Sequence, residues 1–226
     1  MILVVAGWYD TPARRYAVER RAHGVRLVTP ADLSRRQWSL DLPPGRSIVA
    51  LDDGPPEQPS AVLVRLDYIR DSDLPHLAQP DRGYAAAEMT AFLTAWLYAL
   101  TVPVVNPPST VCLSGPGWAW EQWEHAAATM GIPVQPASAS NNGDPPATPA
   151  IGQLVTVAGD RIVGASDPYT ALLARRLARA AGLQLISLTF TTDGIPPRLV
   201  AATPWPNLTD PDIAEAVDDL LRVERS

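Results

Sequence analysis

The stretch Ile2–Ala6 (ILVVA) decides the fold, because five consecutive apolar residues are typical of a short β-strand that is buried on both faces. A helix is predicted next, with Thr11 as its cap and Pro12 in its first turn, ending before Gly24. A second short strand is predicted at Val25–Val28. A strand, a helix and a strand at this spacing predict a parallel sheet with right-handed crossovers.

Further strands and helices extend this pattern through the first half of the chain. The long helix has Glu88 as its only charge after Arg82 and is apolar all round, so we expect it to be packed on most sides. The predicted strands are Ser47–Leu51, Ala61–Asp67 and Val102–Val105, the helical turn is Pro30–Leu33, and the helices are Arg82–Thr101 and Trp118–Met130.

The second half of the chain is predicted to form hairpins and helices of its own. Residues 136–149 are small, polar and rich in proline, which indicates a linker or long loop. After it we expect the hairpins Gln153–Val157 with Arg161–Gly164 and Leu183–Thr191 with Arg198–Ala202, and helices over 168–181 and 211–222. The fold class is therefore α/β, with an N-terminal parallel-sheet lobe at 1–135, a linker at 136–150 and a smaller C-terminal α+β lobe at 151–226.

Charge and composition exclude several classes of protein. The net charge is −6 and the isoelectric point is near 5.0, which argues against a nucleic-acid partner. All 18 basic residues are arginine, so Schiff-base, P-loop and Ser–Lys chemistry are excluded. Abundant Ala, Arg and Pro without Lys is typical of a GC-rich bacterial genome. The single Cys112 cannot form an internal disulfide, and Ala91–Leu100 is only half a membrane span, so we expect a soluble cytoplasmic protein without a membrane partner.

Several segments, in this order, resemble an ATP-grasp protein, particularly the peptide-ligating maturases of microviridin type. They are ILVVAGWYD with RLVTPADL, the stretch from Tyr84 and Glu88 through PVVNPP to MGIPVQP, the hairpin VAGDRIVGA, and LISLTFTTDG with LVAATPWPNL. The resemblance implies a first lobe, a central nucleotide-binding domain and a last lobe whose strands hold the metal. It also implies ATP-dependent ligation of a peptide.

The departures from this family fall on its metal and nucleotide ligands. Where the resemblance implies an acid before Asp-Gly, this chain has Thr189, and where it implies Glu-x-Asn, the chain has Ala201 and Thr203. Mg²⁺ takes carboxylate, carbonyl and phosphate oxygens as ligands, which these side chains do not supply. The family's helix lysine falls near Trp120, and the central domain is represented only by the 136–150 linker.

We therefore expect a degenerate ATP-grasp protein that has no catalytic residue, no metal and no cofactor. It would act as an accessory subunit that binds a protein or peptide partner in a biosynthetic or maturation complex. Two alternatives stay open. One is an enzyme that uses the old substrate cleft for ATP-independent chemistry, and the other is an ATP-dependent ligase completed by a partner.

Four tryptophans mark the candidate partner surface of this accessory protein: Trp118, Trp120, Trp123 and Trp205. Tryptophan is enriched at binding hot spots, and two indoles two residues apart cannot both enter one core from a regular helix. Self-association through this surface is a further possibility. The alternative is that the indoles fill space vacated by the nucleotide and the central domain.

Other reactive residues are interpreted as structural. They are Glu121 with His125, Cys112 with His125, Asp52 with Asp53, Asp71 with Asp73, and the glycines of Gly115–Gly117. The first pair lacks the first of the two histidines that a zinc-binding helix needs, and a lone cysteine is usually a buried thiol. We expect the first pair to lie on a solvated helix face with its histidine ion-paired. The aspartates lie in turn-rich sequence, where they cap backbone groups, and the glycine turn is a weak anion site because its proline removes a donor.

Overall fold

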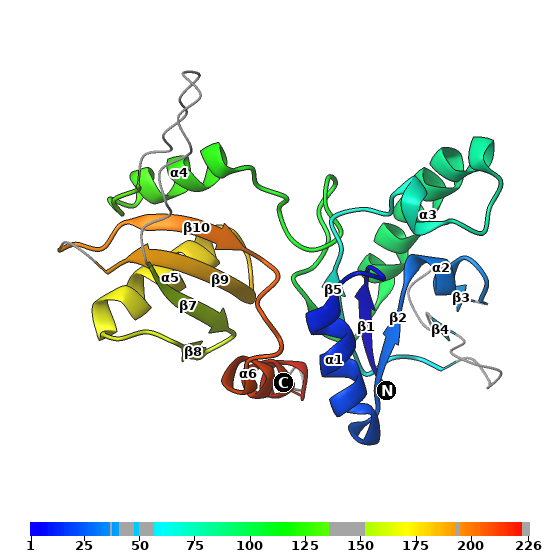
Figure 1. The fold of residues 1–226 in the computed structure, drawn as a ribbon, viewed down its shortest axis with the longest axis horizontal. Coiled ribbons are helices and arrows are strands. Elements are labelled where there is room, and N and C mark those ends of the chain that lie inside the picture. The colour runs from blue at the N-terminus through cyan, green and yellow to red at the C-terminus, as the bar shows by residue number, and fades with distance from the viewer. Residues whose placement is uncertain (37, 41–47, 50–56, 136–151, 193–194, 223–226) are drawn as a thin grey trace. The chain divides into compact units, whose positions relative to one another are not determined.

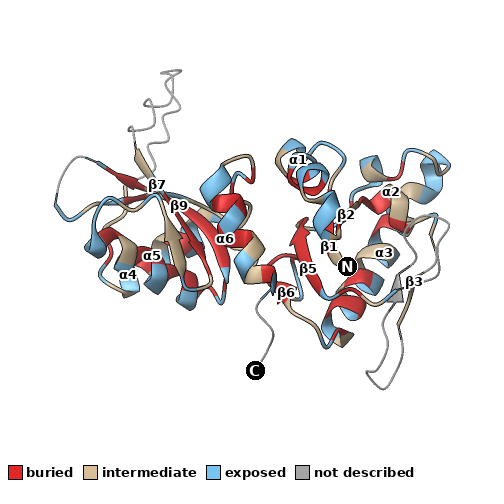
Figure 2. Ribbon diagram, turned by 90° about the horizontal axis from the view of Figure 1, so that it is seen from below, coloured by how far each residue is buried: buried red, intermediate tan, exposed pale blue. Residues whose placement is uncertain are grey.

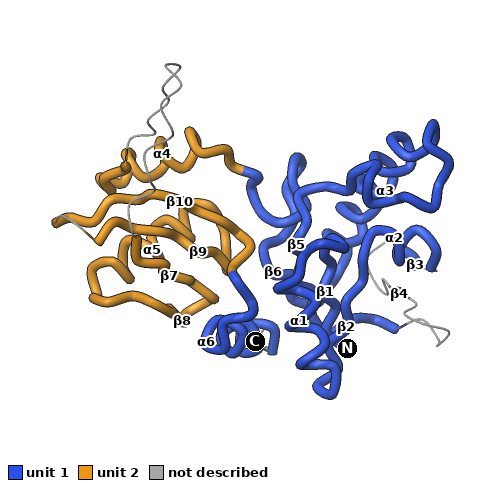
Figure 3. The backbone as a smooth tube through the Cα atoms, viewed as in Figure 1, with its two compact units in different colours: residues 1–117, 207–226 blue, residues 118–206 orange. Residues whose placement is uncertain are grey.

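The computed structural model describes residues 1–36, 38–40, 48–49, 57–135, 152–192 and 195–222 (Figure 1). The chain forms two compact units (Figure 3): unit 1 is residues 1–117 with 207–226, and unit 2 is residues 118–206. Unit 1 contains a four-stranded parallel sheet and unit 2 a four-stranded antiparallel sheet. The α/β class, with a parallel-sheet lobe and a smaller α+β lobe, is therefore confirmed.

The parallel sheet of unit 1 has the strand order β2-β1-β5-β6. Its strands are β1 (Ile2–Ala6), β2 (Val25–Val28), β5 (Ala61–Arg65) and β6 (Val104–Val105). Both neighbours of β1 align at its first residue, where Ile2 pairs with Val25 and with Ala61. Figure 2 shows β5 buried along its length, as a central strand requires. The strand predicted over 47–51 is present in part as β4 (Ile48–Val49), paired antiparallel with β3 (Trp38–Ser39) in a separate sheet.

Helix α1 (Thr11–Glu19) follows β1, but its cap differs from the prediction. Asp10 rather than Thr11 is the N-cap, and its Oδ1 accepts a hydrogen bond from the backbone N–H of Ala13 at 2.9 Å. Carboxylates cap helices as well as hydroxyls do, and the sequence pattern alone placed the start one residue late. The single helix predicted up to residue 23 is also interrupted, because a separate 3₁₀ turn, η1 (Arg21–His23), completes it before Gly24.

Helix α3 (Gln79–Ala99) contradicts the expectation that it is packed on most sides. One side enters the core of unit 1, where Leu93, Trp96 and Leu97 are buried with the sheet residues. The other side is open to solvent, since Tyr84 is 74% exposed and Tyr98 is 60% exposed. The shorter helical turns of unit 1 are α2 (Pro30–Leu33) and η2 (Asp71–Asp73).

Unit 2 is an antiparallel sheet in the order β10-β9-β7-β8, and it confirms both predicted hairpins. Its strands are β7 (Gly152–Ala158), β8 (Arg161–Val163), β9 (Leu185–Thr191) and β10 (Leu199–Thr203). Its helices are α4 (Trp120–Thr129) and α5 (Pro168–Ala180). Asp167 caps α5, because its carboxylate accepts a hydrogen bond from the backbone N–H of Thr170 at 2.9 Å.

Helices α4 and α6 (Pro211–Arg222) do not belong to the compact units that their positions in the sequence suggest. Helix α4 joins unit 2, because Trp123 and Ala127 are buried in the same core as Leu177 and Phe190. Helix α6 joins unit 1. Residues 136–150 lie outside the described residues, so replacement of a central domain by this linker stays a prediction.

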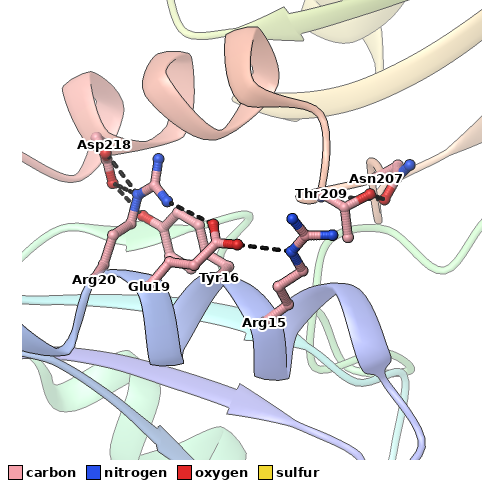
Figure 4. Close-up of polar contacts among 7 residues, drawn as sticks. All are labelled: Arg15, Tyr16, Glu19, Arg20, Asn207, Thr209 and Asp218. Carbon is pink, nitrogen blue, oxygen red and sulfur yellow. Dashed lines mark hydrogen bonds and ion pairs between the residues drawn. The ribbon is translucent and has the colours of Figure 1, made fainter.

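Helix α6 is fixed to α1 by a buried polar cluster that joins residues about 200 positions apart (Figure 4). The Tyr16 hydroxyl donates to Asp218 at 2.6 Å, and Arg20 Nε donates to both oxygens of the same carboxylate at 2.8 and 2.7 Å. The Arg20 guanidinium also lies over the Tyr16 ring, 4.6 Å from its centroid. Burial, together with the hydrogen bond to Asp218, raises the pKa of Tyr16 well above its ordinary range.

Candidate functional site

The three positions predicted to have lost a metal ligand, Thr189, Ala201 and Thr203, lie on one face of the unit 2 sheet. Thr189 on β9 is directly opposite Ala201 on β10 and directly opposite Leu154 on β7. Side chains two residues apart on a strand share a face, so Thr203 lies on the same face as Ala201. The row Leu154–Thr189–Ala201 therefore crosses three strands without a carboxylate.

The next row on this face carries hydroxyls. It runs from Thr156 on β7 through Ser187 on β9 to Thr203 on β10. The hydroxyls of Thr156 and Ser187 are 2.6 Å apart, and both side chains are buried. Each of these two hydroxyls already has a hydrogen-bond partner in the other. We call the two rows together the hydroxyl face.

Among the described strand residues of unit 2, Arg161 is the only ionisable one whose side chain lies on the same side of the sheet as the hydroxyl face. It pairs with Ala158 on β7, which lies two residues beyond Thr156. An arginine can meet an anion such as phosphate or carboxylate, but it repels Mg²⁺. No group of three or more His, Cys, Asp or Glu side chains within the described ranges is arranged to hold a metal ion.

The opposite face of the sheet is covered by α4 and α5, and three of the four candidate tryptophans lie there. Trp123 is buried, and its ring meets that of Trp118 edge-on with centroids 4.8 Å apart. Trp118 and Trp120 are half-buried and both pack against the same core. Two indoles two residues apart can both reach this core because α4 begins at Trp120, so Trp118 precedes the helix and is not bound by its geometry.

Trp205 lies apart from these three, directly after β10. Its backbone N–H donates to Thr203 Oγ1 at 3.2 Å, and its side chain is half-buried. Its neighbour Thr203 belongs to the hydroxyl face, whereas Trp118, Trp120 and Trp123 pack against the core on the other side of the sheet. The structure therefore brings three of the predicted tryptophans together and leaves the fourth beside the hydroxyl face.

Unit 1 contains an open hollow of about 860 Å³ beside α3 that the sequence did not indicate. Its two walls are tied together because the Ile69 N–H donates to Thr90 Oγ1 at 3.0 Å. Arg70 stacks on the exposed Tyr68 ring at 4.5 Å and pairs with Asp67 at 2.7 Å. The remaining lining is Asp71, Gly83, Ala86, Ala87, Ala91, Thr94 and Thr110. Its volume falls in the range of small-molecule sites.

A buried ion pair occupies the carboxyl ends of β1 and β5. The chain order reverses between these two strands, which is where open α/β sheets bind ligands. Arg65 Nε contacts Asp10 at 2.7 Å, with both side chains largely buried. Asp10 is also the cap of α1, so the pair orients the loop that carries the exposed Trp8 and Tyr9. Arg65 could not be singled out from sequence, because it reads as the end of an apolar strand.

The remaining reactive residues have structural surroundings. Glu121 and His125 are both exposed on α4, and no ion pair of 4.0 Å or less involves this histidine within the described chain, so its predicted ion pair is absent. Cys112 is buried in unit 1, whereas His125 belongs to unit 2. Asp73 accepts the backbone N–H of Arg70 at 2.9 Å, as predicted for a capping aspartate. Residues 52 and 53 lie outside the described residues.

The fold is similar to that of solved ATP-grasp ligases. The ATP-grasp ligase PsnB, solved with a minimal precursor, Mg and ADP, matches with a TM-score of 0.68 and 15% identity over 97% of each chain. The macrocyclase MdnC from Microcystis aeruginosa MRC, bound with the precursor peptide MdnA, matches with a TM-score of 0.66 and 13% identity over 99% of each chain. A RiPP-associated ATP-grasp ligase of Chryseobacterium gregarium matches with a TM-score of 0.65 and 10% identity, over 97% of this chain and 96% of its own. At these identities the likeness establishes an ATP-grasp-like fold.

Comparison at the level of sequence adds no relative, since neither a protein-family model nor a curated protein matches the chain. Among the helices of the described residues, none combines the length and the apolarity that crossing a bilayer requires.

Proposed function

We propose that this chain is an ATP-grasp-like protein that does not perform ATP chemistry and instead binds a protein or peptide partner in a peptide-maturation complex. The observation that carries the proposal is the row Leu154–Thr189–Ala201, where opposed strand positions lack any carboxylate. Phosphoryl transfer depends on positioning and on charge stabilisation by Mg²⁺, Lys and Arg. Without magnesium ligands and without lysine, little remains that acts on the phosphates.

The partner is proposed to be a peptide or protein because several similar folds were solved with one. PsnB was solved with its precursor, and MdnC with the precursor peptide MdnA. We place the binding surface at Trp118 and Trp120, which are half-buried beside buried Trp123, and at Trp205 beside the hydroxyl face. Half-buried indoles retain apolar surface that a partner can cover, and such residues carry a large share of binding energy at interfaces.

A ligase completed by a partner is the second candidate, and Arg161 is the observation that favours it. This arginine places one positive charge on the same side of the sheet as the hydroxyl face. A guanidinium group there can bind an anionic group of a nucleotide or substrate. In this alternative a second protein supplies the lysines and the metal ligands. The two candidates differ in whether the purified chain binds Mg·ATP alone and whether a partner restores that binding.

Isothermal titration calorimetry of the full chain with Mg·ATP up to millimolar concentration tests the proposal. We expect no saturable heat. A clear 1:1 isotherm for the chain alone would refute the non-catalytic assignment. Nucleotide binding or turnover that appears only with a co-purified partner would favour the completed ligase.

Partner binding is tested by co-purification from the native host, followed by substitution of the indoles. We expect Trp120→Ala and Trp205→Ala to weaken the complex at least tenfold, which corresponds to about 1.4 kcal/mol of binding energy. Val18→Ala, at an exposed apolar position on α1 in unit 1, is the matched control and should leave binding unchanged. Circular dichroism establishes that each variant is folded. Folded variants that bind at full strength would place the interface elsewhere.

A further inference from the structure

The outer side of helix α5 carries a cluster of arginines. Arg175, Arg176 and Arg179 are all exposed, and the helix contains no acidic residue. Leu172 precedes this cluster and is 53% exposed, and Tyr169 precedes it by one more turn and is 48% exposed. Spacings of three and four residues place all five side chains on one side of the helix. We call these five residues the arginine face.

The arginine face is distinct from the side of α5 that supports the fold. Leu173, Ala174 and Leu177 are buried in the core of unit 2 (Figure 2). An exposed helix face usually mixes both signs of charge. Here three positive charges stand together without a negative one, in a chain whose acidic residues outnumber its basic residues by 24 to 18. A surface of one sign in such a chain indicates a partner of the opposite sign.

The three guanidinium groups of the arginine face have no carboxylate partner within the described residues, where no ion pair of 4.0 Å or less involves them. Arg175 instead donates to the backbone carbonyl of Asp160 at 2.8 Å. Arg176 donates to the backbone carbonyl of Met130 at 2.9 Å. A guanidinium has five N–H donors, so a single hydrogen bond leaves most of them available. The two carbonyls therefore hold these groups in place without neutralising their charge.

The spacing of the arginines suits a polypeptide that carries carboxylates. One guanidinium can donate two parallel hydrogen bonds to one carboxylate, which makes arginine well suited to binding this group. Arg175 and Arg179 are four residues apart, which is about 6 Å along the helix axis. Alternate residues of an extended peptide are about 7 Å apart, so neighbouring acidic side chains on one side of a strand match this spacing. An apolar side chain next to them would lie over Leu172.

We propose that the arginine face binds an acidic segment of a partner polypeptide, with at least two of its carboxylates on the arginines and an apolar side chain on Leu172 and Tyr169. A short peptide supplies both kinds of group. A nucleic acid supplies only the negative charge, and its binding depends on neutralising many phosphates, which a chain with a net charge of −6 does not favour.

This inference does not depend on the loss of ATP chemistry proposed above. Helix α5 covers the side of the unit 2 sheet that lies opposite the hydroxyl face. A positive Mg·ATP titration would therefore leave the arginine face unchanged, and failure to bind an acidic peptide would leave the assignment of the hydroxyl face unchanged. The tryptophan surface is also tested separately, because Trp120→Ala leaves all five residues of the arginine face in place.

Fluorescence anisotropy of a rhodamine-labelled octaglutamate peptide with a central leucine, titrated with the full chain, tests the proposal. We expect saturable binding that weakens at least tenfold when the glutamates of the peptide are replaced by glutamine. Binding should also weaken as NaCl is raised from about 50 to about 300 mM, because salt screens exposed charges. Single-stranded DNA of equal charge and vesicles that contain phosphatidylserine should bind more weakly than the peptide.

Substitutions place the peptide on α5. Arg176→Gln with Arg179→Gln should weaken peptide binding at least tenfold. The matched control, Arg21→Gln with Arg198→Gln, changes the net charge equally at exposed positions outside α5 and should bind as the unmodified chain does. Arg179→Glu covers the case in which the first variant disturbs the fold through the contact of Arg176. Within the described chain the Arg179 side chain has no hydrogen bond or ion pair to lose, so this variant should melt normally and still bind at least tenfold more weakly.

The absence of lysine gives a second, site-specific test. Arg179→Lys introduces a single side-chain amine into the arginine face, and Arg21→Lys introduces one on unit 1 as the control. A carbodiimide joins an amine to a nearby carboxylate, so mass spectrometry should find the peptide linked at position 179 and not at position 21. No saturable binding up to about 1 mM chain would overturn the proposal. So would binding that is insensitive to Arg179→Glu, equal linkage at position 21, or tighter binding of DNA or vesicles than of the peptide.

Discussion

Replacing Thr189 and Ala201 by glutamate would create two opposed carboxylates on the hydroxyl face. The two positions are direct partners across β9 and β10, which places their Cβ atoms about 5 Å apart. Two unit charges at that distance repel by about 0.8 kcal/mol in water, and the aqueous value applies because Ala201 is exposed. In metal-free buffer we expect the unfolding free energy to fall by about 1 kcal/mol, which lowers Tm by about 2–4 °C.

Magnesium should reverse this loss in the double-glutamate variant. Two carboxylates and water supply the oxygen ligands that Mg²⁺ takes. With a Kd of about 1 mM, 10 mM Mg²⁺ adds about 1.4 kcal/mol of stability, so Tm should rise by about 3–6 °C. The unmodified chain, with a hydroxyl and a methyl at these positions, should show no such rise.

The assay is a thermal melt followed by circular dichroism, with MgCl₂ compared with NaCl at equal ionic strength. The double-glutamine variant, Thr189→Gln with Ala201→Gln, is the matched control for side-chain size and strand propensity. If the glutamate pair responds to Mg²⁺ no more than the glutamine pair, the two positions do not form a metal site. If the unmodified chain is itself stabilised by millimolar Mg²⁺, the reasoning that this face has lost its metal is refuted.

Three predictions concern stability. Asp218→Ala removes the acceptor of the buried Tyr16 hydroxyl and of Arg20 Nε, while Arg20 keeps its contact with Glu19 at 3.6 Å. Urea titration should show a loss of about 3 kcal/mol of unfolding free energy, and a loss below about 1 kcal/mol would contradict the contacts of Figure 4. Because the pKa of Tyr16 is raised in the folded chain, the unfolded chain ionises first, and stability should fall as the pH rises above about 10 but fall less in Tyr16→Phe. Hydrogen bonds from Thr170 lower the pKa of Asp167 in the folded chain. The ionised Asp167 therefore stabilises the fold above the ordinary carboxyl pKa, and this stabilisation is lost as the pH falls below that value. Thermal melts at acid pH should show no such loss in Asp167→Asn.

Local sequence signals predicted most of the secondary structure. The apolar run of β1 and the hairpins of unit 2 depend on neighbouring residues, and both are confirmed. The predicted cap of α1 is one residue too late. Asp10 is held in place partly by a hydrogen bond from Arg65, which lies 55 positions away and is not visible in the local sequence. The expectation that α3 is packed on most sides was wrong. Composition shows how apolar a helix is, but only the fold shows which of its sides packs against other elements.

The hydroxyl face was predictable only in part. Sequence placed Thr189 and Ala201 on two strands of one hairpin, but their direct pairing depends on an irregularity in β10 between Leu199 and Ala201. A one-residue shift would have turned the whole strand over. The bond between Tyr16 and Asp218 joins residues about 200 positions apart, and no local pattern signals such a contact.

The discontinuity of unit 1 affects how the protein is made on the ribosome. Synthesis proceeds from the N-terminus, so β1 and α1 are complete long before α6, which follows all of unit 2. During that interval the side of α1 that receives Asp218 has no partner, and the apolar residues Ile213 and Val217 that α6 buries have not yet been translated. Unit 2, being continuous, can fold as soon as it leaves the exit tunnel. Translation therefore completes unit 2 before unit 1, although unit 1 contains the first residues of the chain.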